Sequence, residues 1–173
     1  MEKNFLPEVK INLKSERIVL KNFTLKNINT FYINWFNGKN EILKNSRHYR
    51  KKYQRNILVK NFISSQNSSI FIGIFDKKSN NLIGTMIAKK ELNNTRLNIG
   101  ILIGNKDYFS KGFAFESLDL FINFIFKKNK YKSIIFGTNK KNLSMIKLAK
   151  KFKVTKKISK FNSSVIFELK KNN

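Results

Sequence analysis

Five consecutive residues, 110–114 (SKGFA), lie between an apolar strand and an apolar helix and have types suited to binding a phosphate group. The segment 104–126, GNKDYFSKGFAFESLDLFINFIF, directly follows the apolar run LNIGILI. The first N–H groups of a helix have no partner within it, and the helix dipole adds partial positive charge there, so a phosphate can bind without a dedicated side chain. Ser110, Gly112 and Ala114 permit close approach, and Lys111 adds charge. A plain turn is the alternative, because glycine is common at such junctions for geometric reasons alone.

The pattern of apolar residues predicts the elements that hold this junction in place. Strands are expected where apolar residues alternate or run together, and helices where they recur at spacings of three and four. One strand–helix–strand crossover, 97–138, requires parallel strands, and the junction lies within it. The order of elements predicts a mixed α/β sheet that is antiparallel in its first half. The expected strands are 17–23, 69–75, 81–90, 95–104, 131–138 and 163–170, and the expected helices are 24–38, 53–65, 112–128 and 142–152.

The central strand and the helices carry more specific expectations. Strand 95–104 is apolar on both faces, as a central strand should be. Helix 112–128 is apolar except for one narrow polar stripe that is predicted to meet water, and each of the two earlier helices is predicted to pack one apolar side. The stripe is Glu116, Asp119, Asn123 and Lys127; the packed sides are Ile28, Phe31, Tyr32 and Trp35 in the first helix and Ile57, Leu58, Phe62 and Ile63 in the second.

The formal charge of +26 in 173 residues has two explanations. An anionic partner such as nucleic acid, a membrane surface or a phosphorylated ligand would select for it. Alternatively, lysine is simply abundant together with Asn, Ile and Phe. The lysines are spread from Lys3 to Lys171 instead of being gathered in one segment, which favours composition as the main cause.

Composition also excludes several kinds of site. The absence of cysteine excludes disulfides, thiolate metal sites and a cysteine nucleophile, and with His48 as the only histidine no metal is predicted. The start of the chain lacks the apolar core of a signal peptide, and no apolar run approaches the ~20 residues of a membrane span. A cytoplasmic location is therefore expected. A monomer and a homodimer both agree with the sequence.

The segment NIGILIGNKDYFSKGFAFESL resembles the cofactor loop of the GCN5-related N-acetyltransferases (the GNAT superfamily), in their ribosomal-protein and amino-sugar branch. There, a strand with Ile-Gly precedes Gly-x-Gly-aromatic-Ala-x-Glu-Ala at a helix start; here residues 99–100 and 111–117 fall in register. NKKNLSMIKLAKKFKV resembles the later Asn-x-x-Ser-Ile helix, ERIVLKNFT the opening strand and WFNG the end of the first helix. The resemblance covers about 16–169. It implies one GNAT domain over 1–173, with a single mixed, mostly antiparallel twisted sheet and helices on both faces.

The resemblance implies acetyl-coenzyme A as the acetyl donor. Its pyrophosphate would lie on the backbone amides of 110–114, and its pantetheine arm would run along 101–103 as a pseudo-strand and meet Asn142. Lys147 and Lys150, with Lys111, are candidates for the adenosine 3′-phosphate. The implied cofactor-binding residues are Ile101, Leu102, Ile103, Ser110, Lys111, Gly112, Phe113, Ala114 and Asn142.

The chain departs from the superfamily pattern at positions that bear on chemistry. Ser110 stands where the loop most often has glycine, which affects the phosphate cradle little because backbone amides do not depend on side chains. Asn98 stands where a carboxylate often precedes Ile-Gly, and Ala149 replaces the tyrosine that serves as an acid in many relatives. The last two departures leave proton transfer unassigned.

Acetyl transfer to an amine requires that the amine be deprotonated and held near the carbonyl carbon of the thioester. It also requires a hydrogen-bond donor to the developing oxyanion, and a backbone N–H of 101–103 is a candidate for that donor. There are three candidate proton acceptors: Glu91, His48, and a water held by Asn98. Ser144 or Tyr108 could protonate the leaving thiolate. Each of these residues also has a purely structural interpretation.

The acceptor is predicted from the stretch NEILKNSRHYRKKYQ, which covers the acceptor entrance in relatives. Arg47, His48 and Tyr49 suit a nucleotide-linked amino sugar, with arginine for phosphate and an aromatic ring for stacking. A solvated basic loop is the alternative interpretation, and the N-terminal amine of a ribosomal protein is the second candidate acceptor. A non-enzymatic nucleic-acid-binding module also remains open, although aromatic residues such as Phe121 and Phe124 lie at core-like positions and no RNA-binding fingerprint is visible.

Overall fold

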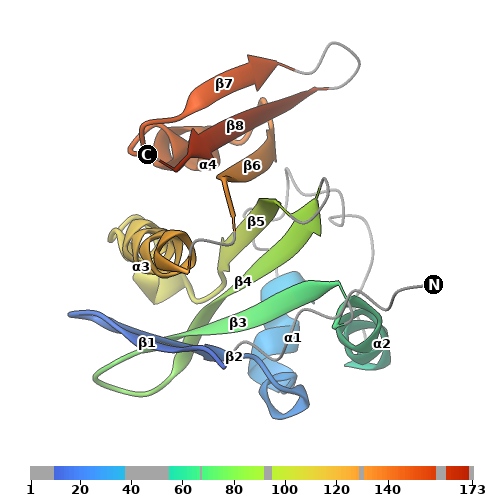
Figure 1. The fold of residues 1–173 in the computed structure, drawn as a ribbon. Coiled ribbons are helices and arrows are strands. Elements are labelled where there is room, and N and C mark those ends of the chain that lie inside the picture. The colour runs from blue at the N-terminus through green and yellow to red at the C-terminus, as the bar shows by residue number, and fades with distance from the viewer. Residues whose placement is uncertain are drawn as a thin grey trace.

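Eight strands form one sheet, in the order β1-β2-β3-β4-β5-β6-β8-β7 (Figure 1). The structure is a computed structural model that describes residues 10–37, 55–66, 68–91, 95–128, 131–158 and 163–171. All neighbouring strands are antiparallel except β5 and β6, which are parallel. The strands are β1 (Asn12–Lys14), β2 (Ile18–Asn22), β3 (Ser69–Asp76), β4 (Leu82–Glu91), β5 (Arg96–Ile103), β6 (Ser133–Asn139), β7 (Thr155–Ile158) and β8 (Ser164–Lys170).

The predicted mixed sheet and the parallel crossover are confirmed. The prediction missed β1 and β7, the two edge strands of the sheet. Both are short, three and four residues, and they carry lysine or asparagine among their few apolar residues, so neither shows the alternation that marks a strand.

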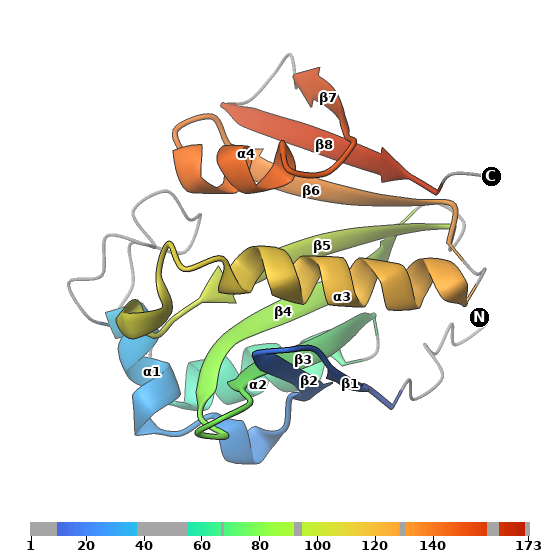
Figure 2. The ribbon, with the colours of Figure 1, turned by 90° about the vertical axis from the view of Figure 1, so that its left-hand side faces the viewer.

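Helices cover both faces of the sheet, as predicted. In the part of the chain that the structure describes, the α-helices are α1 (Thr30–Asn37), α2 (Arg55–Ser65), α3 (Phe113–Lys127) and α4 (Leu143–Ala149), and short 3-10 turns lie at Leu25–Asn27 and Lys106–Tyr108. Figure 2 shows α3 and α4 in front of the sheet, with α1 and α2 behind it. The larger core lies on the α3 side, where fully buried Phe121 packs with Phe136 of β6 and Phe167 of β8.

A smaller apolar cluster lies under α1 and α2. Its members are Phe23, Ile28, Tyr32, Trp35, Leu58 and Phe62. The predicted packed sides were only partly right, since Phe31 of α1 and Ile57 and Ile63 of α2 are exposed. On α2 the buried residues are Leu58 and Phe62, four residues apart, and half-buried Val59 also packs against the cluster, so the packed side of the helix differs from the one that the sequence suggested. Burial raises the pKa of Tyr32 to about 12, although a hydrogen bond with Thr85 opposes the shift.

The two parallel strands stay together over only part of their length. Residues Arg96 to Asn98 of β5 pair with Ser133 to Ile135 of β6, whereas β5 follows β4 as far as Ile103 and β6 follows β8 as far as Asn139. The strands therefore diverge after their first three residues (Figure 2). The expectation that β5 is buried on both faces is wrong for its second half, where Gly100 is exposed and residues 101–103 are half-buried, because β6 has left its side.

Candidate functional site

The junction between β5 and α3 contains two residues with left-handed backbone conformations. Ser110 has φ of 58° and Gly112 has φ of 86°. Glycine adopts such values without steric cost, and other residues adopt them at a penalty. Ser110 thus occupies a conformation normally taken by glycine. Residues 110–112 are exposed, and at Gly112, which has no side chain, the exposed surface is backbone.

The N-terminus of α3 has no side-chain cap. Its N-cap residue is Gly112, and the first helical hydrogen bond runs from the Glu116 N–H to the Gly112 carbonyl. The N–H groups of Phe113, Ala114 and Phe115 therefore lack partners within the helix. At α4, by contrast, the Asn142 side chain accepts a hydrogen bond from the Met145 N–H at 3.1 Å. The start of α3 is thus left with free donors that an anion can use.

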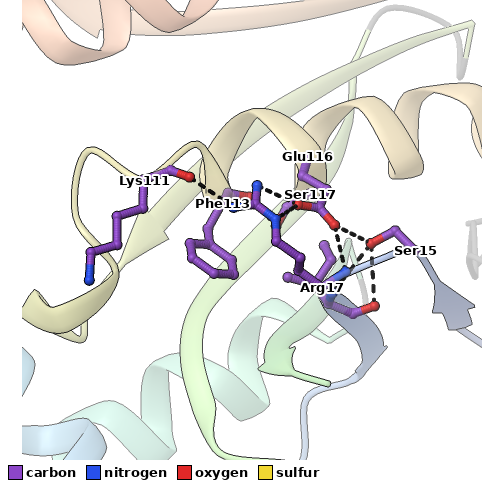
Figure 3. A network of polar contacts seen from close by, with 7 residues as sticks. Ser15, Arg17, Lys111, Phe113, Glu116 and Ser117 are labelled. Atoms are coloured by element: carbon purple, nitrogen blue, oxygen red, sulfur yellow. Dashed lines mark hydrogen bonds and ion pairs between the residues drawn. The ribbon is translucent and has the colours of Figure 1, made fainter. Parts of the chain in front are cut away.

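Glu116, in the first turn of α3, binds the turn before β2 (Figure 3). Its carboxylate accepts hydrogen bonds from the Ser15 hydroxyl at 2.6 Å, the Arg17 N–H at 3.0 Å and the Arg17 Nε at 2.7 Å. The prediction that Glu116 belongs to a water-facing stripe is therefore wrong, whereas Asp119, Asn123 and Lys127 are exposed as predicted. Partial burial alone would raise the pKa of Glu116, but the hydrogen bonds from Ser15 and Arg17 together hold that pKa below its usual value.

The free edge of β5 offers backbone groups beside this loop. The Gly104 N–H donates to the Ile83 carbonyl of β4 at 3.0 Å. Because successive residues of a strand direct their backbone groups to opposite edges, those of Ile103 and Ile101 point away from β4, and those of Leu102 point toward it. Ile101 and Ile103 thus face the side from which β6 has diverged.

The ends of β5 and β6 bring the remaining cofactor candidates to one edge of the sheet. Since the strands are parallel, their carboxyl ends point the same way, and the loop 104–112 and the β6–α4 turn both start there. Asn142 is half-buried in that turn, and Ser144 is exposed on the first turn of α4. Lys151, just after α4, has its Nζ 5.3 Å from the centre of the Phe115 ring. A cation from the end of the α4 region therefore lies beside the first turn of α3.

Polar side chains lie beside Asn98, the last β5 residue that is paired with β6. The Asn98 amide nitrogen donates to Glu91 Oε1 at 2.6 Å, and Arg96 Nη2 lies 3.3 Å from Glu91 Oε2. Asn98 is half-buried, on the strand positions that alternate with the buried Leu97 and Ile99. The hydrogen bond between Glu91 and Asn98 therefore places a carboxylate beside position 98, where the sequence itself has an amide.

The remaining predicted residues differ in what the structure describes of them. Arg47, His48 and Tyr49 lie outside the described residues. Tyr108 packs its ring against Phe113 at 5.0 Å between centroids, which gives it a packing role. Ala149 stands at the position where the resembled superfamily often has a tyrosine that acts as a general acid, and it is fully buried.

Sequence analysis missed the contacts that Arg17 and Trp35 make with the loop. A Cβ atom on Gly104 would lie 2.0 Å from Trp35 Cδ2, so the indole packs directly on the backbone at the end of β5. The only signal for Arg17 was the acid at position 116 near the start of an otherwise apolar helix, because a carboxylate that becomes partly buried there needs a partner. No such signal exists for Trp35, since only the fold brings α1 to β5.

Within the described ranges, no three His, Cys, Asp or Glu residues gather as a metal site would require. In the same residues, no helix has the length and apolarity needed to cross a membrane.

Comparisons with known proteins agree with this geometry. The family model of the acetyltransferase (GNAT) domain matches residues 17–155. Among solved structures, a GNAT-family acetyltransferase from Bacillus anthracis is 18% identical with a TM-score of 0.72, over 92% of this chain and 98% of that one. A Salmonella typhimurium acetyltransferase that modifies the N-terminal serine of ribosomal protein L7/L12 is 13% identical with a TM-score of 0.74, over 91% and 97%.

The microcin C7 self-immunity acetyltransferase MccE, in complex with acetyl-CoA and AMP, is 15% identical with a TM-score of 0.75, over 90% of this chain and 93% of that one. At these identities the structures share a fold. Curated protein sequences give no significant match. The match of the family model to most of the chain places it in the GNAT acetyltransferase family. It is an N-acetyltransferase, and its co-substrate is acetyl-CoA.

Proposed function

We propose that acetyl-CoA binds where β5 and β6 diverge and that its pyrophosphate lies on the loop 110–114. The observation that carries this proposal is the free edge of β5 beside an uncapped helix N-terminus. Free N–H groups and the positive end of the helix dipole favour a pyrophosphate there. The exposed backbone at Gly112 and the small side chain of Ala114 leave room for it.

The rest of the donor would lie between the two strands. Backbone groups of Ile101 and Ile103 are available to the pantetheine arm, which would take the place of a paired strand, and Leu102 would contribute its side chain. Asn142 has one polar atom engaged in capping α4, and its amide N–H groups can bind the same arm. Exposed Lys111, with Lys147, Lys150 or Lys151 of the α4 region, would meet the 3′-phosphate. One acetyltransferase domain would then span 1–173, with its core at about 16–169.

Bound acetyl-CoA supplies a reactive thioester. The chain supplies position and proton transfer. Glu91, hydrogen-bonded to Asn98 at 2.6 Å, lies beside the last β5 residue that is paired with β6 and would accept the proton of the acceptor ammonium, directly or through a water. The backbone N–H of Ile101 or Ile103 would donate to the acetyl oxygen. Ser144, exposed at the β6 side, is the candidate proton donor to the thiolate.

For the acceptor we propose a primary amine on a nucleotide-linked amino sugar. Arg47, His48 and Tyr49 supply cationic and aromatic groups in the sequence, with arginine suited to phosphate and an aromatic ring to stacking. The complex of the structurally similar MccE with acetyl-CoA and AMP supports the idea that a protein of this fold can bind a nucleotide together with acetyl-CoA. A second candidate is the N-terminal amine of a ribosomal protein, which is favoured by the similar fold of an acetyltransferase that acts on such a protein.

Thermal unfolding and an acceptor screen test the proposal. A ligand that binds only the folded state adds about 2.7 kcal/mol of stability at a hundred times its Kd. Acetyl-CoA should raise the midpoint clearly in moderate salt, and ATP should raise it little. Coenzyme A release should then follow addition of a nucleotide-linked amino sugar and depend on Glu91. Equal shifts with both nucleotides would argue against the site, and release only with ribosomal-protein peptides would select the second acceptor.

A further inference from the structure

A single guanidinium connects the turn before β2 to both sides of the α3 start. Arg17 Nη2 lies 2.7 Å from Glu116 Oε2, and Arg17 Nε donates to the same oxygen at 2.7 Å. Arg17 Nη1 donates to the Lys111 carbonyl at 3.1 Å. Its carbon Cζ lies 4.4 Å from the centre of the Phe113 ring. Figure 3 shows these contacts converging on Arg17 from the loop and from the helix.

The contact with Lys111 sets the orientation of one particular peptide group. The bond between Lys111 and Gly112 is trans, so its C=O and N–H point in opposite directions. Because Arg17 binds this carbonyl, the Gly112 N–H points away from Arg17. The peptide belongs to a loop with positive φ at Ser110 and Gly112, and the penalty of this conformation at Ser110 is tolerated only where the surrounding structure holds the loop.

Arg17 also offsets the negative charge of Glu116, which lies near the proposed phosphate site. A carboxylate in the first turn of α3 lies close to the site proposed for a pyrophosphate and would repel it. Ion pairing with Arg17 offsets that charge, and three hydrogen bonds from Ser15 and Arg17 fix the carboxylate in place. Glu116 in turn holds the Arg17 side chain in the position from which it reaches the Lys111 carbonyl.

We propose that Arg17 and Glu116 are positioning residues of the donor site, which set the affinity for acetyl-CoA by holding the Lys111–Gly112 peptide without touching the ligand. This inference rests on the proposed placement of acetyl-CoA. It differs from direct binding of phosphate by Arg17, in which Glu116 would be only a competitor for the arginine.

The two interpretations predict opposite effects of Glu116→Gln. If Arg17 binds phosphate itself, removing the competing negative charge should leave acetyl-CoA affinity unchanged or increase it. If the pair positions the loop, the weakened hold on Arg17 should lower that affinity. Asp119→Asn is the matched control, because Asp119 lies three residues further along α3, is exposed and makes no contact with the loop that the structure records.

The test is calorimetric titration of acetyl-CoA into wild type, Glu116→Gln, Arg17→Met, Arg17→Lys and Asp119→Asn, below the unfolding midpoint of each. We expect Kd to rise about tenfold or more in Glu116→Gln and Arg17→Met, which corresponds to about 1.4 kcal/mol. Arg17→Lys should not restore wild-type affinity, since an ammonium lacks the planar fork that reaches both partners. Asp119→Asn should stay within twofold.

Amide exchange without ligand gives an independent measurement. In the two positioning variants, exchange of residues 110–114 should accelerate while that of β3 and β4 stays unchanged, which separates loop release from global destabilisation. If Glu116→Gln binds acetyl-CoA as tightly as wild type or more tightly, the positioning role is wrong even though the donor site stands. If wild type itself does not bind acetyl-CoA, the proposed donor site fails first.

Discussion

Asn98 and Ile135 form the last pair that joins β5 to β6. Beyond them the two strands separate, β5 continuing with β4 and β6 with β8. Among the described residues, the half of β5 that follows Asn98 consequently has one edge bonded to β4 and one edge with no strand beside it. The proposed donor site depends on this divergence, because an extended ligand can pair only with an edge that no strand already occupies.

Gly112→Trp should abolish acetyl-CoA binding and leave the rest of the fold intact. An indole on the N-cap residue of α3 would fill the space proposed for the pyrophosphate. The φ of 86° adds a penalty of about 1–2 kcal/mol for any residue with a Cβ, so Gly112→Ala should show that loss of stability alone. The changes are measured by chemical denaturation and by titration with acetyl-CoA.

Gly137→Ala is the control for this series. A Cβ there would meet no atom within 4 Å, and its φ is not positive, so we expect a change within about 0.5 kcal/mol. Retained acetyl-CoA affinity in Gly112→Trp would show that the loop is only a turn.

Ser110→Gly should be tolerated or stabilising. Ser110 has φ of 58°, which glycine adopts at no steric cost, although glycine also makes the unfolded chain more flexible. The net gain is expected to be no more than about 1 kcal/mol. Ser110→Val, a β-branched residue in the same conformation, should lower the free energy of unfolding. A large loss in Ser110→Gly would mean that the serine side chain, and not the backbone, maintains the loop.

Gly104→Ala should be markedly destabilising because its Cβ would lie 2.0 Å from the Trp35 ring. Overpacking of this kind costs about 1–3 kcal/mol, measured as the free energy of unfolding. In a Trp35→Leu background the same change should cost less, since the clashing ring is gone. Additive effects of the two substitutions would contradict the direct contact.

Glu116 should make stability depend on pH below neutrality. Its pKa is lowered in the folded state, so its stabilising contribution is present above the pKa of about 4.3 in the unfolded chain and is lost as the pH falls through the folded value. The difference in unfolding free energy between wild type and Glu116→Gln should therefore be largest at neutral pH and shrink in acid. A difference that stays constant into acid pH would contradict the assignment.

The sequence was sufficient to predict the order of the main elements and the position of the loop. Apolar strands and helices with regular spacing define β2 to β6, β8 and the four helices, and the Gly-Phe-Ala run marks the start of α3. These features are local. Short edge strands such as β1 and β7 depend on neighbours for their hydrogen bonds, and for that reason their own residues did not reveal them.

The parts of the site that were missed all join distant segments. Arg17 and Glu116 are 99 residues apart, and Trp35 reaches Gly104 only after α1 packs on the sheet. The divergence of β5 and β6 is equally absent from the sequence, because it depends on the neighbours that the two strands keep, β4 for β5 and β8 for β6. The carboxylate beside Asn98 comes from Glu91 on the neighbouring strand, so an amide at position 98 does not mean that the site lacks a base.

Residue-resolved amide exchange with and without acetyl-CoA tests the proposed donor site most directly. Binding should slow exchange at Ile101 and Ile103, whose N–H groups face the open side, and at Gly112 and Ala114 in the loop. Leu102, whose N–H faces β4, should already exchange slowly and change little, and ATP should not reproduce the pattern at Ile101 and Ile103. Unchanged exchange at these residues under saturating acetyl-CoA, or protection located elsewhere in the chain, would contradict the account.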